Sequence, residues 1–111
     1  MTAIPEYRPL DDLGRLLHED DYPAQLALAL ARLEAALARI GRSARDLGEL
    51  RVTTTDPRAF SAARDVLEER LEAIRATPVT TVVKVGALPP PGTLIGLDAT
   101  LIPIHTKEAH R

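Results

Sequence analysis

Few side chains of this sequence could do chemistry, and they fall into two groups. Lys84 and Asp98 lie in two β-rich segments and could act as a base and an acid, or could simply form an ion pair. His18, Glu19, Asp20 and Asp21 follow one another, and histidine beside carboxylates is a combination that metals accept. One histidine with carboxylates specifies no particular ion, however. We therefore predict neither a metal nor a cofactor.

The composition is that of one globular domain. Of the 111 residues, 45% are hydrophobic and 27% are charged, and the formal net charge is −2, which argues against disorder and against attraction to a phosphate backbone. One Phe, two Tyr and no Trp provide no platform for stacking bases, so we expect no nucleic-acid partner. There is no cysteine for a disulfide or a thiolate. Without a signal segment or a long apolar run, the sequence predicts a cytoplasmic protein with no membrane partner.

Two segments have the apolar periodicity of amphipathic helices. In the first, Asp20 or Asp21 is the expected N-cap. Pro23 lies in its first turn and Gly41 ends it. The second helix has Asp56 as its expected N-cap. The apolar stripes consist of Leu26, Leu30, Leu33, Leu37 and Ile40 in the first helix and of Phe60, Ala63, Leu67, Leu71 and Ile74 in the second.

The other apolar segments alternate as strands do. Residues 50–55, 79–87 and 93–102 are rich in Val, Ile, Leu and Thr, and shorter strands are expected at 4–10 and 14–18. Helices alternating with strands predict an α+β fold, in which a mixed sheet carries both helices on one face. We expect one domain over residues 1–103 and a polar C-terminal tail over residues 104–111. The residues expected to be buried include Leu30, Leu33, Leu37, Phe60, Leu67, Leu71, Val83 and Val85.

Side-chain alternation predicts which groups of the last two strands share a face. Thr80, Val82 and Lys84 lie on one face of their strand. Gly96 and Asp98 lie on one face of theirs. We predict that the two sets share the sheet face turned away from the helices. The pattern alone favours a hairpin of these two strands across the proline-rich loop.

The segment from Thr77 to Ala99 resembles the C-terminal signature of the Rid (YjgF-like, reactive intermediate deaminase) family. Thr80 stands where that signature has an arginine, and Gly96 stands where it has its first glutamate. Tyr7, followed by the segment 12–17, resembles the opening hairpin of the family. The long loop that follows this hairpin in the family is mostly deleted here.

This resemblance implies the fold, the assembly and the place of the site. It implies a homotrimer whose helix-free sheet face lines the centre, with ligand clefts between subunits and a last strand inserted beside the first. In the family, the arginine holds a substrate carboxylate and the glutamate orients the water that attacks an imine carbon. At the matching positions no catalytic residue is expected. The candidate ligand-binding residues are Tyr7, Arg64, Thr80, Val82, Gly96 and Asp98.

Two of these candidates have a structural alternative. Tyr7 could be a packing anchor with its hydroxyl at the surface. Arg64 could replace the missing carboxylate anchor, or it could pair with Glu68 one helical turn further on.

Three functions are compatible with the sequence. We favour a Rid-like trimer that binds a small metabolite or a partner protein and lacks 2-imino acid deaminase activity. One alternative is a Rid-type enzyme that acts on an imine, an enamine or another labile metabolite without a carboxylate. The other is a structural subunit of a mixed trimer, in which a catalytically complete Rid paralogue supplies the missing arginine.

Overall fold

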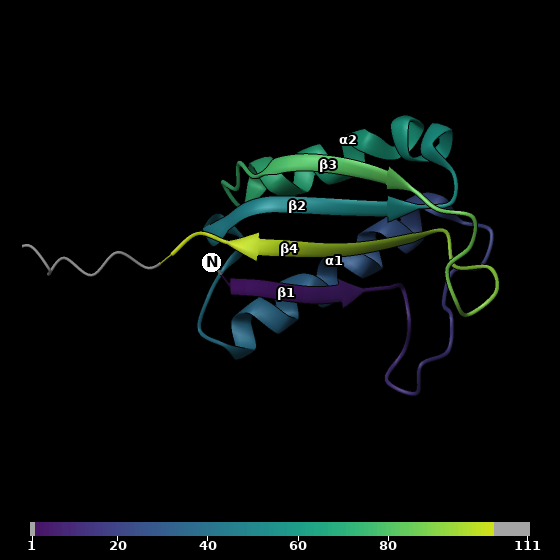
Figure 1. Cartoon of the computed structure of the whole chain (residues 1–111), viewed down its shortest axis with the longest axis horizontal. Coiled ribbons are helices and arrows are strands. Elements are labelled where there is room, and N and C mark those ends of the chain that lie inside the picture. Colours follow the sequence, from purple (N-terminus) through teal and green to yellow (C-terminus); the bar gives the residue numbers. More distant parts are fainter. Residues whose placement is uncertain (1, 104–111) are drawn as a thin grey trace, which may run out of the picture.

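The computed structural model describes residues 2–103, in which two helices pack against one face of a four-stranded sheet (Figure 1). The order of the strands across the sheet is β1-β4-β2-β3; β3 runs parallel to β2, and the other two pairs are antiparallel. The predicted α+β fold is therefore confirmed. The predicted tail, residues 104–111, lies outside the described residues. The elements are β1 (Thr2–Tyr7), α1 (Tyr22–Arg39), the short 3-10 helix η1 (Ala44–Asp46), β2 (Leu47–Thr54), α2 (Pro57–Ala73), β3 (Val79–Lys84) and β4 (Ile95–Leu101).

Both helices begin at the caps that the sequence predicts. The Asp21 carboxylate accepts a hydrogen bond from the backbone N–H of Ala24 at 3.1 Å, and Asp56 accepts one from Ala59 at 3.0 Å. After α1, Gly41 has a φ of +73°, a conformation that glycine adopts without steric cost. Neither of these helices is long and apolar enough to cross a membrane.

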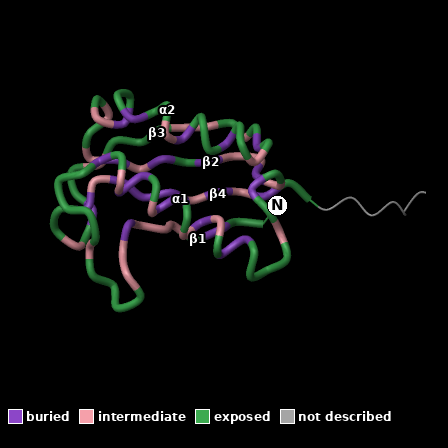
Figure 2. The backbone as a smooth tube through the Cα atoms, turned by 180° about the vertical axis from the view of Figure 1, so that it is seen from behind, coloured by how far each residue is buried: buried purple, intermediate pink, exposed green. Residues whose placement is uncertain are grey.

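The apolar stripes of the helices pack against β2 and β4. Figure 2 shows the buried residues, in purple, along these elements, with exposed loops around them. Two residues that were predicted to be buried are not: Val83 is 42% exposed and Val85 is half-buried. Val83 is paired with Thr53 on the sheet face that carries no helix, and β3 is an edge strand, so no other element within residues 2–103 covers it. The predicted residues that are buried are Leu30, Leu33, Leu37, Phe60, Leu67 and Leu71.

The strand expected at residues 14–18 does not form. Leu10 and Leu16 make a single antiparallel bridge. Between them, the Asp11 side chain accepts hydrogen bonds from the backbone N–H groups of Leu13 and Arg15, at 2.8 and 2.9 Å. Because the Asp11 carboxylate accepts from these backbone N–H groups, they do not pair with a second strand, and the segment forms a turn.

β4 lies between β1 and β2, not in a hairpin with β3. The hairpin that the pattern favours was wrong, and the central insertion implied by the family resemblance is confirmed. As a result, β1 and β3 are the two edge strands of the sheet.

One buried hydroxyl connects four of these elements. Thr54, the last residue of β2, donates from Oγ1 to the carbonyl of Leu94 at 2.9 Å and accepts from the N–H of Asp56 at 3.1 Å. The hydroxyl of Tyr22 lies 2.6 Å from the same Oγ1. Because the Thr54 proton is used on Leu94, the tyrosine is the donor. Burial raises the pKa of the Tyr22 phenol, which keeps this donor protonated.

We expect Leu33→Ala to lower the free energy of unfolding by about 2–5 kcal/mol, because the side chain is fully buried and its loss leaves a cavity. Urea denaturation measures the change. Leu13→Ala is the matched control, since Leu13 is 76% exposed; its effect should stay within about 0.5 kcal/mol. Equal losses for the two variants would contradict the described core.

Thr54→Val keeps the shape of the side chain and removes the hydroxyl. The variant leaves the buried hydroxyl of Tyr22 without its partner, at a cost of about 1–3 kcal/mol, and it removes the hydrogen bonds to Leu94 and Asp56. We therefore expect a clear loss of stability by thermal or urea denaturation. Thr54→Ser keeps the hydroxyl and should recover most of that loss. If Val were tolerated as well as Ser, the proposed hydrogen-bond role would be wrong.

Candidate functional site

Gly96 and Asp98 lie on the sheet face that carries no helix, which we call the open face. In the register of the sheet, Gly96 is opposite Thr53 and Asp98 is opposite Arg51. The Arg51 Nε donates to Asp98 Oδ2 at 3.3 Å. Asp98 is therefore paired with an arginine of the neighbouring strand.

Thr80, Val82 and Lys84 lie on the other face, the one that the helices cover. In the parallel pairing of β3 with β2, Thr80 is next to Leu50 and Val82 is next to Val52, and both β2 side chains are fully buried in the core. The prediction that these three residues share a face with the β4 candidates was wrong. Alternation along one strand gives relative faces only. The register between strands decides which face each set occupies, and it places Lys84 and Asp98 on opposite faces of the sheet.

Thr80 and Arg64 line the same hollow, of 330 Å³, between β3 and α2. Arg64 Nε donates to Glu68 Oε2 at 3.1 Å, and its guanidinium carbon lies 5.4 Å from the centre of the Phe60 ring. The pairing with Glu68 that was predicted as the alternative is therefore confirmed. The guanidinium of Arg64 is engaged on its own helix, by a carboxylate on one side and a ring on the other.

The space beside Gly96 is filled by a carboxylate from another strand. A Cβ atom on residue 96 would lie 2.7 Å from Glu6 Cδ and 2.7 Å from Glu6 Oε2. Arg8 holds this carboxylate: its Nε donates to Glu6 Oε1 at 2.8 Å, and its Nη2 lies 2.7 Å from the same oxygen. The Nη1 of Arg8 donates to the carbonyl of Pro89 at 2.8 Å, in the loop between β3 and β4.

Sequence reasoning missed Glu6 because its place depends on an irregularity in the pairing of β1. Ile4 is opposite Ala99, but Tyr7 is opposite Leu97, so the register shifts between Ile4 and Tyr7. With strict alternation Glu6 would share the buried face of Ile4. An extra residue on one strand reverses the faces that follow it. No local signal other than the proline at position 5, a residue that suits edge strands and bulges, could have indicated this.

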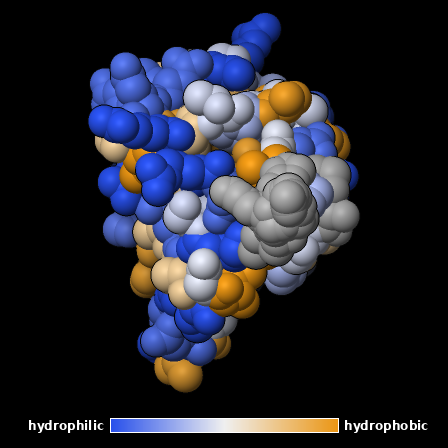
Figure 3. All heavy atoms as spheres, turned by 90° about the vertical axis from the view of Figure 1, so that its left-hand side faces the viewer, coloured by the Kyte–Doolittle hydropathy of each residue, from blue (hydrophilic) through white to orange (hydrophobic). Residues whose placement is uncertain are grey.

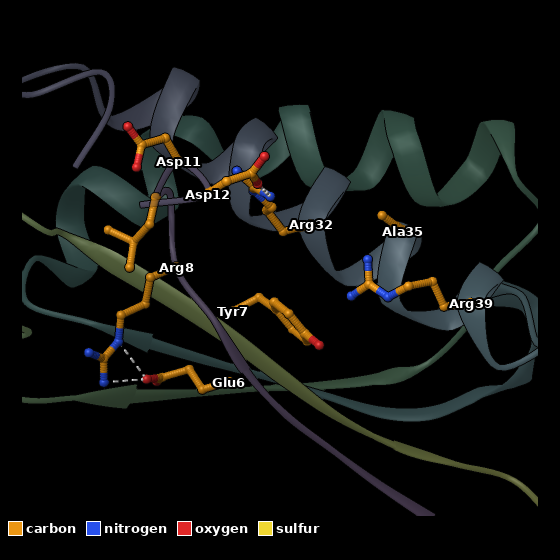
Figure 4. A pocket seen from close by; sticks show the side chains of 9 residues that line it. Glu6, Tyr7, Arg8, Asp11, Asp12, Arg32, Ala35 and Arg39 are labelled. Carbon is orange, nitrogen blue, oxygen red and sulfur yellow. Dashed lines mark hydrogen bonds and ion pairs between the residues drawn. The ribbon is translucent and has the colours of Figure 1, made fainter. Parts of the chain in front are cut away.

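Tyr7 faces α1 and is half-buried against the core. It also lines a groove of 510 Å³ between the end of β1, the segment after it and α1. In Figure 4 its ring lies on the α1 side of the strand, and the Glu6–Arg8 pair lies on the other side. Tyr7 is therefore a packing residue as well as part of the groove wall. The groove is lined by Glu6, Tyr7, Arg8, Leu10, Asp11, Asp12, Arg32, Ala35 and Arg39.

The segment His18–Asp21 leads into α1 and is held through its backbone. Gln25, which is fully buried, donates from Nε2 to the carbonyls of His18 and Gly92 at 3.2 and 3.1 Å, and its Oε1 accepts from the N–H of Leu94 at 2.8 Å. The amide thus ties this segment to the loop before β4. Over residues 2–103 no group of three His, Cys, Asp or Glu side chains is arranged to hold a metal ion.

Residues 7–102 match the family model described as Endoribonuclease L-PSP. Among solved structures, a Mycobacterium tuberculosis member of the YjgF/YER057c/UK114 family is 29% identical, with 91% of this chain and 77% of that chain covered and a TM-score of 0.73. Escherichia coli TdcF with bound serine is 22% identical, with coverages of 92% and 80% and a TM-score of 0.80. The Rid protein YyfB from Yersinia pestis is 25% identical, with coverages of 92% and 77% and a TM-score of 0.77. Comparison with curated proteins finds no match.

This chain belongs to the Endoribonuclease L-PSP family, in which the YjgF and Rid proteins are found. The resemblance seen in the segment from Thr77 to Ala99 is confirmed. The match begins at Tyr7, the last residue of β1, and extends through β4, so it covers Gly96 but not Glu6.

Proposed function

We propose that this protein is a Rid-family homotrimer that binds a small molecule or a partner protein in clefts between its subunits, and that it does not hydrolyse 2-imino acids. The proposal depends on one observation. Arg64, the arginine that lines the hollow of Thr80, is held by Glu68 and lies over Phe60. A threonine hydroxyl cannot form the bidentate, charge-assisted contact by which an arginine holds a carboxylate.

The uncovered sheet supports the assembly. Val79 and Val83 lie on the open face and are 67% and 42% exposed. They belong to an edge strand that has no charged residue before Lys84, and such an edge readily pairs with another chain. Figure 3 looks at the end of the molecule where β3 begins, and there hydrophobic side chains lie in small groups among hydrophilic ones. We expect the open face to close around a threefold axis.

The separation of the candidate residues supports clefts between subunits. Thr80 lies under the helices near one edge of the sheet, Gly96 lies on the open face, and Tyr7 lies at the opposite edge. They can share a site only if two copies contribute to it. The groove beside Tyr7 has room for a small molecule, and the related TdcF structure contains serine, which favours a ligand of about that size.

A Rid-type enzyme acting on a substrate without a carboxylate is the second candidate. The observation that favours it is Glu6, whose carboxylate lies where a side chain of residue 96 would be. A positioned carboxylate could orient a water or take up a proton.

We expect light scattering to give a solution mass of three chains, each of 12.1 kDa. Val83→Glu should dissociate the assembly, because a charge would be buried where the open faces meet. Leu13→Glu, at a residue that is 76% exposed, should leave the mass unchanged. A stable monomer of the unmodified protein would contradict the proposed assembly.

In an assay coupled to an amino-acid oxidase, we expect no acceleration of 2-iminopropanoate or 2-iminobutanoate hydrolysis above background. Loss of a charge-assisted hydrogen bond weakens binding by about 1.5–3 kcal/mol, which corresponds to roughly tenfold or more. Turnover by the purified homomer would show that another residue anchors the substrate carboxylate, and Arg64 would be the first candidate.

Thr80→Arg is the gain-of-function control for this assay. Adding Gly96→Glu to it is a poor choice, because the new side chain would collide with Glu6. Activity of Thr80→Arg alone would mean that the rest of the cleft is complete. Continued inactivity would fit a deeper defect in the shortened loop before α1.

A further inference from the structure

Gly96 lies in a central strand, and its backbone does not require a glycine. Its φ is outside the left-handed region in which Gly14, Gly41 and Gly92 lie. Glycine weakens a strand and often marks the close approach of another group. Here that group is the carboxylate of Glu6, whose Oε2 is 2.7 Å from the position that a Cβ would occupy. The glycine leaves room for this carboxylate.

The Glu6 carboxylate is fixed by one oxygen and available through the other. Both contacts from Arg8 go to Oε1. Within residues 2–103 no hydrogen bond is formed to Oε2. The Glu6 side chain is 23% exposed, so the carboxylate is shielded on most sides and still reachable. A carboxylate can accept about four hydrogen bonds, which leaves capacity here for a ligand.

Glu6 lies at the border between two concave surfaces. It lines the groove of 510 Å³ between the end of β1, the segment after it and α1, and it also lines a hollow of 380 Å³ on the open face, beside Asp98. If the open face meets another copy, the carboxylate of Glu6 lies at that interface. Its position is therefore compatible with the clefts between subunits that we propose.

We propose that Glu6 Oε2 accepts a hydrogen bond from an amino or ammonium group of the ligand, and that this contact selects amines over carboxylates. The inference rests on the proposed function as a small-molecule-binding protein and names the ligand class. Arg8 has no free pair of N–H donors that could hold a ligand carboxylate, because its Nε, Nη1 and Nη2 already contact Glu6 and Pro89. An ammonium group on a carboxylate forms a charge-assisted hydrogen bond, roughly twice as strong as a neutral one.

Propylammonium and propionate are suitable probes, because they have similar size and opposite charge. In titrations of the ¹⁵N-labelled protein followed by NMR, we expect propylammonium to shift the amide signals of Glu6, Arg8 and Gly96 in a saturable manner. Propionate should cause no saturable shift at these residues. Glu6→Gln should weaken propylammonium binding by about tenfold or more, the effect of losing a charged hydrogen bond.

Two further variants separate a ligand contact from a structural role. Glu49→Gln removes a carboxylate from the same open face, where Glu49 contacts Thr81 and Thr100 at 3.4 and 3.5 Å. It should change the affinity by less than about twofold, as expected for a charge without a direct contact to the ligand. In the double variant Glu6→Ala with Gly96→Glu, the new side chain on β4 places a carboxylate where that of Glu6 was. This variant should regain most of the binding that Glu6→Ala loses.

Three results would overturn the inference. These are no saturable binding of propylammonium, equal binding of propionate, and an unchanged affinity in Glu6→Gln. If the double variant folds with the melting temperature of the wild type but does not regain binding, Glu6 is structural and the inference also fails. The light-scattering and imine-hydrolysis experiments test the proposed function separately. A trimer that is inactive on imino acids and does not bind propylammonium would contradict this inference but not the proposed function.

Discussion

A single buried hydroxyl, that of Thr54, fixes the relative positions of the elements that carry the site. It is bonded to the entry of β4, to the cap of α2 and to the first residue of α1. The side chains of Thr54 and Tyr22 are buried, so their hydrogen bond favours the one arrangement of these elements in which both hydroxyls are satisfied. Gln25 adds a second connection by linking the segment before α1 to the loop before β4. These contacts lie where β4 begins beside the end of β2, at the pair Thr54–Ile95, in the register that places Gly96 and Asp98 on the open face.

The pairing of β1 with β4 then places a carboxylate beside Gly96. The register shift between Ile4 and Tyr7 sends the tyrosine toward α1 and the glutamate between them onto the open face. There the carboxylate lies in the space that the glycine of β4 leaves free. The glycine on one strand and the glutamate on the next are thus two parts of one arrangement. A carboxylate occupies this point of the sheet although position 96 has no side chain.

The charges around the candidate residues favour ligands other than carboxylates. Arg8, Arg51 and Arg64 each contact a carboxylate of the same chain. A guanidinium that is already paired must lose that partner before it can hold a ligand anion, so each pair lowers the affinity for carboxylates. The carboxylate of Glu6, by contrast, keeps one oxygen without a hydrogen bond in the described part of the chain. Around Gly96, the balance of donors and acceptors therefore favours a ligand group that donates hydrogen bonds.

The sequence by itself determined the start of α2 at Asp56, the start of α1 at Asp20 or Asp21, the buried stripes such as Leu33 and Leu67, and the family, because caps, periodicity and motifs are local. Only the tertiary structure decided that Thr80 and Gly96 lie on opposite faces of the sheet and that Glu6 lies beside Gly96. The register between strands far apart in the sequence sets both outcomes, and one extra residue in β1 reverses every face beyond it. Alternation within a strand cannot contain that information, because it repeats identically whichever face is buried.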